Sequence, residues 1–134
     1  MEIPGLIIMG DEVRNNLKYT GTHEWLKLSG ENAKIGITDH AQSELTDIVF
    51  VELPQVGKEV KKGEEICVVE SVKSVSEIYA PVSGKIVNVN KKLEDTPEII
   101  NKNPYDDGWL VEIKVKDKSE INSLLDPESY KKII

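Results

Sequence analysis

One lysine stands between two strand-like segments and could carry a covalent group. Residues 65–70 and 76–80 are rich in β-branched and apolar side chains, and Ser71 to Ser74 is the only interruption between them. This pattern predicts a β-hairpin with Lys73 at its tip. The turn contains neither Gly nor Pro, which favours a type I geometry that most residue types tolerate. A primary amine on a rigid tip can serve as the attachment point of a cofactor; the alternative is an ordinary solvated lysine.

A His–Glu pair near the start of the chain is the second candidate for chemistry. His23 and Glu24 are adjacent, and adjacent side chains of a strand point to opposite faces of the sheet. The pair is therefore not expected to act together as acid and base. We expect a structural role for one residue and a pocket role for the other.

Other catalytic signatures are missing from the sequence. It has no glycine-rich phosphate loop, no His/Cys spacing typical of a zinc site and no nucleophile elbow. The single cysteine, Cys67, lies in an apolar strand segment, which predicts a buried, unreactive thiol. We do not expect a free-standing enzyme.

The elements that must position these residues are mostly strands. Short β-branched runs alternate with turns that are rich in Pro, Gly, Asn and Asp. The predicted strands span residues 23–28, 33–38, 47–53, 65–71, 76–80, 85–90 and 109–116. Short helices are expected at 40–45, capped by Asp39 with Gln42 in a capping box, at 96–100, opened by Pro97, and at 127–132 after Asp126.

A short internal repeat surrounds the predicted hairpin. Residues 57–62 and 84–89 each follow a Pro-containing turn, and each enters a short strand through Gly-Lys-x-Val. Lys73 lies between the two copies. A pseudo-twofold β structure with its modified residue on the joining hairpin is the pattern of a carrier domain.

Composition and charge narrow the class further. A chain of 134 residues with 39% hydrophobic and 31% charged residues fits one soluble globular domain. The net charge of −7 opposes binding to nucleic acid or to an anionic membrane. The apolar run at 6–9 is too short to span a bilayer and lacks the basic flank of a signal peptide. The single cysteine fits a reducing compartment, and the start of the chain is too poor in arginine for a mitochondrial transit peptide, so a prokaryotic cytoplasm is expected.

The sequence around Lys73 resembles the lipoyl-attachment region of the glycine cleavage system H proteins, notably in Glu70-Ser71-Val72-Lys73 and in the run from Ile78 to Gly84. The resemblance continues in family order through residues 19–25, 35–42, 47–54 and 103–110. It implies one carrier domain at 17–134, mostly β, with the flattened β-barrel of lipoyl and biotinyl carriers (the barrel-sandwich hybrid), short helices and a C-terminal helix. Residues 1–16 have no counterpart in the family and form an N-terminal extension, either a frayed end or a small docking segment.

By this resemblance, Lys73 would carry lipoic acid in amide linkage. The family member is a non-catalytic shuttle that takes the aminomethyl group from a pyridoxal-phosphate glycine decarboxylase to a tetrahydrofolate-dependent aminomethyltransferase. A flavin-dependent dihydrolipoyl dehydrogenase then reoxidises the arm, and lipoylating enzymes attach it. We expect a monomer with these protein partners.

The resemblance also suggests residues that line a cleft for the loaded arm. In the family these are a hydroxyl residue just before the His–Glu pair and an acid shortly after the modified lysine. Here the positions carry Thr22 and Glu77, alongside Glu24. The hypothesis is that the three shelter the cationic aminomethyl arm from hydrolysis; the alternative is three solvated polar side chains. One departure is Thr46, which stands where the family usually has glycine, so the local turn could differ.

Four alternatives to a glycine-cleavage carrier exist. The lipoyl domains of 2-oxo-acid dehydrogenases are shorter and lack the opening His-Glu-Trp strand and the C-terminal helix. H-like proteins also carry lipoate for sulfur metabolism or for lipoate relay, and sequence separates these poorly. A biotin carrier would have methionines beside the lysine, where this chain has Val72 and Ser74. An enzyme that uses Lys73 as a Schiff-base nucleophile would need a desolvated amine, which an exposed hairpin tip does not provide.

Overall fold

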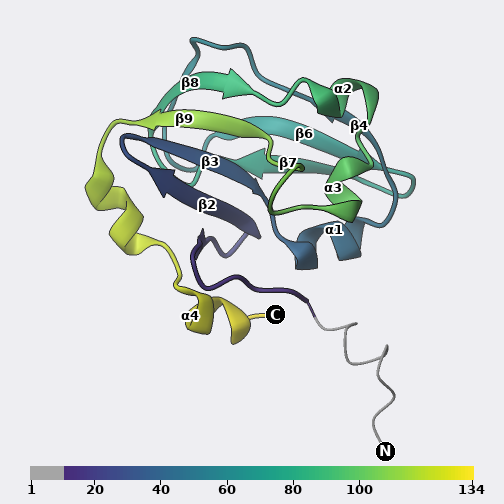
Figure 1. Ribbon diagram of the computed structural model, residues 1–134, viewed down its shortest axis with the longest axis horizontal. Coiled ribbons are helices and arrows are strands. Elements are labelled where there is room, and N and C mark those ends of the chain that lie inside the picture. Colours follow the sequence, from purple (N-terminus) through teal and green to yellow (C-terminus); the bar gives the residue numbers. More distant parts are fainter. Residues whose placement is uncertain (1–10) are drawn as a thin grey trace, which may run out of the picture.

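The computed structural model describes residues 11–134, and its strands form two antiparallel sheets that face each other in a flattened sandwich (Figure 1). The sheets do not close into a barrel. The first sheet has the order β1 (Lys18–Tyr19), β2 (Glu24–Ser29), β3 (Asn32–Ile37), β9 (Val111–Val115), β8 (Gly84–Val89) and β5 (Glu59–Val60). The second sheet has the order β4 (Ile48–Glu52), β6 (Glu65–Ser71) and β7 (Val75–Tyr79). The expected mostly-β carrier fold is confirmed.

The main core lies between the two sheets. Ile35 and Ile113 point inward from the larger sheet, and Val69 and Ile78 point inward from the smaller one; all four are almost fully buried. Alternating burial along β6 and β9 is what the two-residue period of a strand requires. Each such side chain contributes about 1.5–3 kcal/mol of burial free energy, so this core holds the sheets in register.

The two repeat segments lie next to each other in the larger sheet. β5 and β8 pair antiparallel, with Glu59 opposite Lys85 and Val60 opposite Gly84. The pairing extends beyond β5, because Ile86 N donates to Lys58 O at 2.8 Å. The repeat predicted from the sequence is therefore a structural pair.

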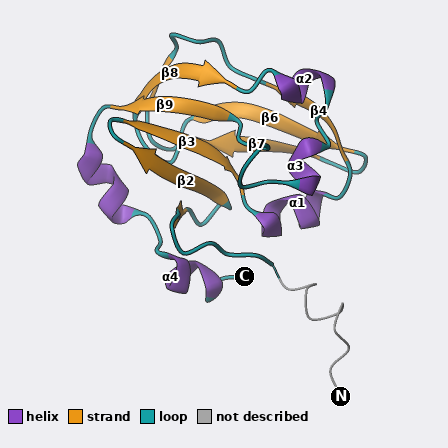
Figure 2. Cartoon of the chain, in the orientation of Figure 1, coloured by secondary structure: helices purple, strands orange, loops and turns teal. Residues whose placement is uncertain are grey.

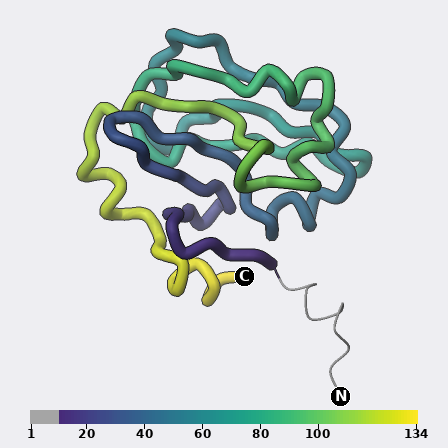
Figure 3. The backbone as a smooth tube through the Cα atoms, in the orientation of Figure 1, coloured from purple at the N-terminus to yellow at the C-terminus, as the bar shows by residue number. Residues whose placement is uncertain are grey.

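A second, smaller core covers the outer side of the larger sheet near the chain ends. It contains Leu17, Tyr19, Trp25, Tyr105 and Tyr130. The rings of Tyr19 and Tyr130 stack with centroids 4.5 Å apart. The start of the described chain and the C-terminal helix lie side by side there, as Figure 3 shows, and Tyr19 pairs with Leu125.

The part of the N-terminal extension that the structure describes, residues 11–16, contacts the domain. Glu12 N donates to the carboxylate of Asp39 at 2.8 Å, and Arg14 N donates to the hydroxyl of Tyr19 at 2.7 Å. The guanidinium of Arg14 also reaches Asp106 at 2.9 Å. The apolar run at 6–9 lies outside the described residues.

Short helices lie at the edges of the sandwich (Figure 2). They are α1 (Asp39–Leu45), α2 (Lys92–Asp95), α3 (Ile99–Lys102) and α4 (Pro127–Lys131), with a 3-10 helix, η2, at Lys118–Ser123. Asp126 caps α4 as predicted, since its carboxylate accepts from Ser129 N at 2.8 Å. The predicted strands all form, with ends displaced by no more than two residues. The elements α2, η2 and β1 were not predicted, because each is too short to show a periodic pattern of hydrophobic residues.

The predicted capping box at α1 is wrong. The N-cap is Thr38, whose hydroxyl accepts from Ala41 N at 3.2 Å. Asp39 is the first helical residue, and its carboxylate accepts from the side chain of Gln42 at 2.9 Å. Thr38 is fully buried and extended, so it satisfies the helix end from inside the domain.

Candidate functional site

Lys73 lies at the tip of the β6–β7 hairpin, where the sequence placed it. The last strand pair is Glu70 opposite Val75, and Ser71 N donates to Ser74 O at 2.8 Å. Lys73 and the residue before it form the loop, and neither has a left-handed backbone, which agrees with a turn that most residues tolerate. The hydroxyl of Ser71 accepts from the backbone N–H of Lys73 at 3.3 Å and of Ser74 at 3.1 Å. These bonds hold the tip in one conformation.

The surroundings of Lys73 leave its amine accessible. Lys73 is exposed, and its neighbours Val72 and Val75 are 66% and 63% exposed. Val72 N donates to Asp47 O at 3.0 Å, which ties the tip to the start of β4. The three strands of the smaller sheet contain four glutamates and no lysine or arginine, so Lys73 extends from an acidic sheet. An exposed amine suits an attachment point and not a Schiff-base nucleophile.

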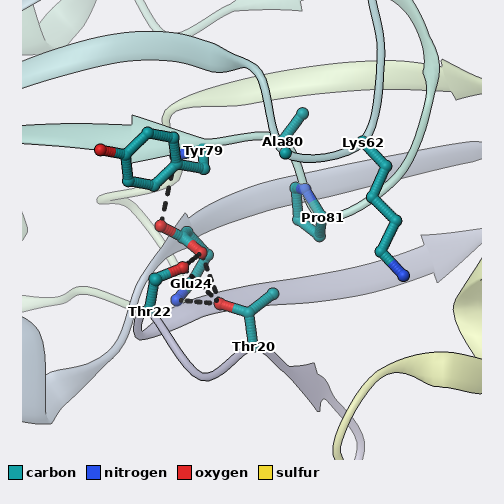
Figure 4. A pocket seen from close by; sticks show the side chains of 8 residues that line it. Thr20, Thr22, Glu24, Lys62, Tyr79, Ala80 and Pro81 are labelled. Atoms are coloured by element: carbon teal, nitrogen blue, oxygen red, sulfur yellow. Dashed lines mark hydrogen bonds between the residues drawn. The ribbon is translucent and has the colours of Figure 1, made fainter.

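A cleft of about 340 Å³ opens between the start of β2 and the end of β7 (Figure 4). Glu24 supplies its buried carboxylate, and the side chain is only 1% exposed. The cleft is lined by Thr20, Thr22, Glu24, Lys62, Gly63, Tyr79, Ala80 and Pro81. A buried carboxylate in an otherwise mostly apolar cleft can hold a small cation.

Hydrogen bonds keep the carboxylate of Glu24 in place. Its Oε1 accepts from the hydroxyls of Thr20 and Thr22, the second at 2.5 Å, and its Oε2 accepts from Tyr79 N at 3.2 Å. Burial raises the pKa of Glu24, and the hydrogen bonds from Thr20, Thr22 and Tyr79 oppose that rise because they favour the ionised form. The carboxylate of Glu24 is therefore removed from water but surrounded by hydrogen-bond donors that stabilise its negative charge.

Of the three residues expected in the cleft, Thr22 and Glu24 line it and Glu77 lies outside it. Thr22 and Glu24 are in direct contact within the cleft. Glu77 is exposed and does not line it; the hydroxyl of Tyr79 donates to Glu77 Oε2 at 3.0 Å. This bond raises the pKa of the Tyr79 phenol, because ionising it would leave two negative charges together. Glu77 therefore reaches the cleft only through Tyr79.

Sequence reasoning missed Thr20 as a cleft residue. A tight turn brings Thr20 over Glu24, with Thr20 N donating to Glu24 O at 3.0 Å and His23 N to Thr20 O at 3.2 Å. His23 adopts a left-handed φ of 71° in this turn. The only sequence signal is the polar Thr-Gly-Thr run before the His–Glu pair, which is typical of many turns.

His23 and Glu24 have the divided roles that the sequence suggested. Nδ1 of His23 lies 2.7 Å from the hydroxyl of Tyr130, and its ring centroid lies 4.7 Å from that of His40. Burial and the neighbouring His40 lower the pKa of His23. His23 thus helps attach α4 to the domain, while Glu24 belongs to the cleft.

Three further observations describe the thiol, possible metal ligands and helix lengths. Cys67 is buried as predicted, and burial raises the pKa of its thiol far above the ordinary range. Within residues 11–134, the acidic, histidine and cysteine side chains form no cluster of three that could hold a metal ion. Across the same residues no helix has both the length and the apolar character needed to cross a bilayer.

Two antiparallel sheets with an exposed lysine at a hairpin tip define a β carrier domain of the lipoyl and biotinyl type. The model of the glycine cleavage H-protein family matches residues 17–134. The chain belongs to that family.

Known proteins agree with this assignment. The chain is 57% identical over 118 residues to a glycine cleavage system H protein of Geobacillus kaustophilus, covering 88% of this chain and 93% of that protein. It is 53% identical over 120 residues to one of Halalkalibacterium halodurans, covering 90% and 94%. The crystal structure of a glycine cleavage system H protein from Mycobacterium marinum superposes with a TM-score of 0.83 at 36% identity, covering 90% of this chain and 97% of that one.

Proposed function

We propose that this chain is the lipoyl carrier of a glycine cleavage system, with lipoic acid attached to Lys73. The observation that carries the proposal is the exposed lysine on a rigid hairpin tip, in a chain of the H-protein family. The relatives reported above are all named for glycine cleavage, which favours this system over sulfur metabolism or lipoate relay.

The residues of the tip fit an attached arm. The amine of Lys73 can form an amide with the lipoyl carboxyl group, and the amide removes the charge of the side chain. The hydroxyl of Ser71 holds the backbone of the tip, so the arm starts from a fixed point. When attached, lipoate supplies thiol–disulfide chemistry through its dithiolane ring.

In this role the chain is a carrier and not a catalyst. A tethered arm gives each partner a high local concentration of the shared intermediate, which diffusion of a free compound would not provide. The partners are the glycine decarboxylase, the aminomethyltransferase, the dihydrolipoyl dehydrogenase and a lipoylating enzyme. The bacterial relatives support the expected cytoplasmic location, and we retain the expectations of a monomer that binds neither nucleic acid nor membrane.

The cleft is proposed to hold the cationic end of the loaded arm. β7 runs from the hairpin to Tyr79 at the cleft, and Glu24 supplies a buried negative charge there. Thr22 donates one hydrogen bond to this carboxylate, and Glu77 contacts the cleft residue Tyr79. Excluding water around the bound cation would protect it from hydrolysis.

Intact-mass analysis of protein from a lipoylation-competent host tests the attachment. The wild-type chain should show one lipoyl adduct, and Lys73→Arg should remove it. Lys85→Arg, on the exposed face of β8, is the matched control and should keep the adduct. An adduct that persists in Lys73→Arg would refute the assignment of Lys73.

A reconstituted assay tests the pathway. Lipoylated protein should support exchange between glycine and bicarbonate with the decarboxylase, and a lipoylated chain that supports none would point to another lipoate pathway. For the cleft, Glu24→Ala should shorten the lifetime of the aminomethyl-loaded form. An unchanged lifetime would remove Glu24 from the proposed role.

A further inference from the structure

We propose that Thr20 is a positioning residue for the carboxylate of Glu24, and that its hydroxyl sets how firmly the cleft retains the cationic arm. The inference rests on the proposed function of the cleft and adds a residue that family resemblance does not supply. It is carried by the contacts between Thr20 and Glu24 (Figure 4).

Thr20 and Glu24 are joined by three hydrogen bonds. The hydroxyl of Thr20 donates to Glu24 Oε1 and accepts from Glu24 N at 3.0 Å, and Thr20 N donates to Glu24 O at 3.0 Å. The hydroxyl therefore uses both its donor and its acceptor role on Glu24, and it also lies 3.3 Å from the hydroxyl of Thr22. Thr22, by contrast, makes one bond to Glu24 and is itself exposed. Thr20 is the residue that determines where the carboxylate points.

The hydrogen bonds to Glu24 leave one of its carboxylate oxygens free to accept a further donor in the cleft. An ionised carboxylate offers about four acceptor positions on its two oxygens. Oε1 receives two hydroxyl donors, whereas Oε2 receives only Tyr79 N. Oε2 is thus the oxygen with room for a cationic donor, and it lies on the side of the cleft that β7 forms.

The same hydroxyl opposes the effect of burial on the charge of the carboxylate. A hydrogen bond to the charged form favours that form, so loss of the Thr20 hydroxyl would raise the pKa of Glu24 further. A neutral Glu24 would no longer attract a cation. Retention of the arm would then fail at a higher pH than in the wild-type protein.

Other titratable groups near Glu24 must be separated from this effect. They are Lys62 in the β5–β6 turn, Cys67 on β6, Glu77 and Tyr79 on β7, and Tyr130 on α4. The pKa values of the three neutral groups, Cys67, Tyr79 and Tyr130, are raised from their ordinary values, so these groups stay neutral at pH 5–8. Burial lowers the pKa of His23, whose ring contacts Tyr130. The titration must therefore be observed at Glu24 itself.

The test compares Thr20→Val with Thr20→Ser in the full chain. Val keeps the shape and removes the hydroxyl, whereas Ser keeps the hydroxyl. NMR of ¹³C-labelled glutamate carboxyls, with Glu24→Gln for assignment, follows the titration in the unloaded protein. Thr20→Val should raise the Glu24 midpoint by about one pH unit, because a hydrogen bond to a charged group is worth about that much. Thr20→Ser should leave the midpoint at the wild-type value.

The lifetime of the loaded arm is the second readout. After loading with glycine and the decarboxylase, release of the aminomethyl group from Thr20→Val at pH 7 should be about tenfold faster than from wild type, and Thr20→Ser should restore the slow rate. An unchanged midpoint and lifetime in Thr20→Val, or no rescue by Ser, would overturn the proposal. If Thr20→Val does not fold, Thr20→Ala removes the same hydroxyl and is held to the same outcomes.

Failure of the proposal and failure of the proposed function give different results. If the wild-type arm never loads, the carrier function is wrong, and the carboxyl titration alone decides whether Thr20 positions Glu24. If the arm loads and the Thr20 variants behave as wild type, the function stands and Thr20 has no positioning role.

Discussion

Thr46 holds a backbone conformation that glycine would adopt at lower cost. Its φ of 63° and ψ of −148° place a β-branched residue in a region that strongly favours glycine. The chain has little freedom to relax, because Thr46 N donates to Gln42 O at 2.9 Å and Thr46 O accepts from the side chain of Asn101 at 2.8 Å. Replacing Thr46 with glycine should therefore stabilise the protein.

The magnitude follows from three contributions. A residue held in such a region costs about 1–3 kcal/mol. Glycine loses about 0.5–1 kcal/mol more backbone entropy on folding than alanine does. The hydroxyl of Thr46 donates to Leu45 O at 2.5 Å, and losing this part-buried bond costs about 0.5 kcal/mol. The net gain expected for Thr46→Gly is about 1 kcal/mol, or about 3–5 °C in Tm for a domain of this size.

Urea and thermal unfolding, followed by far-UV circular dichroism, measure the change. Thr46→Ala is the matched control, because alanine loses the hydroxyl but keeps the Cβ that causes the strain. Alanine should be neutral or slightly destabilising. A loss of stability in Thr46→Gly, or an equal gain in Thr46→Ala, would refute the argument from backbone strain.

Three other substitutions test the fold and its pH dependence. Gly84→Ala should destabilise by about 3 kcal/mol in urea unfolding, since an added Cβ would lie 2.2 Å from Lys114 O in the neighbouring strand. His23→Asn should flatten the fall in stability below about pH 6.5: burial lowers the folded pKa, so the unfolded chain binds more protons there. Tyr130→Phe should cost about 1–2 kcal/mol in the same unfolding assay, because its hydroxyl lies 2.8 Å from the Thr38 hydroxyl and 2.7 Å from His23 Nδ1.

Each of these three predictions would be contradicted by a specific result. Gly21→Ala, where an added Cβ meets nothing within 4 Å, should be nearly neutral, and an equal loss there would show that the Gly84 effect is not steric. Asn tolerates the left-handed backbone of His23, so an unchanged pH slope in His23→Asn would assign that slope to other groups. A Tyr130→Phe variant as stable as wild type would show that the hydroxyl network contributes little.

Local patterns in the sequence predicted those parts of the fold that depend on local interactions. The strand period, the Gly-free turn and the Asp126-Pro127 helix start all act over a few residues, and the structure contains each of them. The N-cap of α1 was mispredicted because Asp39 and Thr38 are both good caps. Only the buried, extended position of Thr38 selects it.

The cleft shows where local reasoning stops. Family resemblance brought Thr22, Glu24 and Glu77 together as one expected set, but Glu77 is exposed and meets the cleft through its hydrogen bond with Tyr79. Thr20 had no distinctive signal, because a threonine in a polar turn is common. Its importance comes from the turn that folds it back onto Glu24.

Short-range features and motifs of the chain were enough to predict the carrier fold, the family and the position of Lys73 at a hairpin tip. The fold and the hairpin follow from the strand period and the turn residues, and the family follows from motifs of consecutive residues. Only tertiary contacts bury Glu24, bring Tyr79 N to its carboxylate from 55 residues away and join the side chain of Asn101 to Thr46 O. Burial and contacts between distant strands exist only once the two sheets have packed, so no local pattern encodes them.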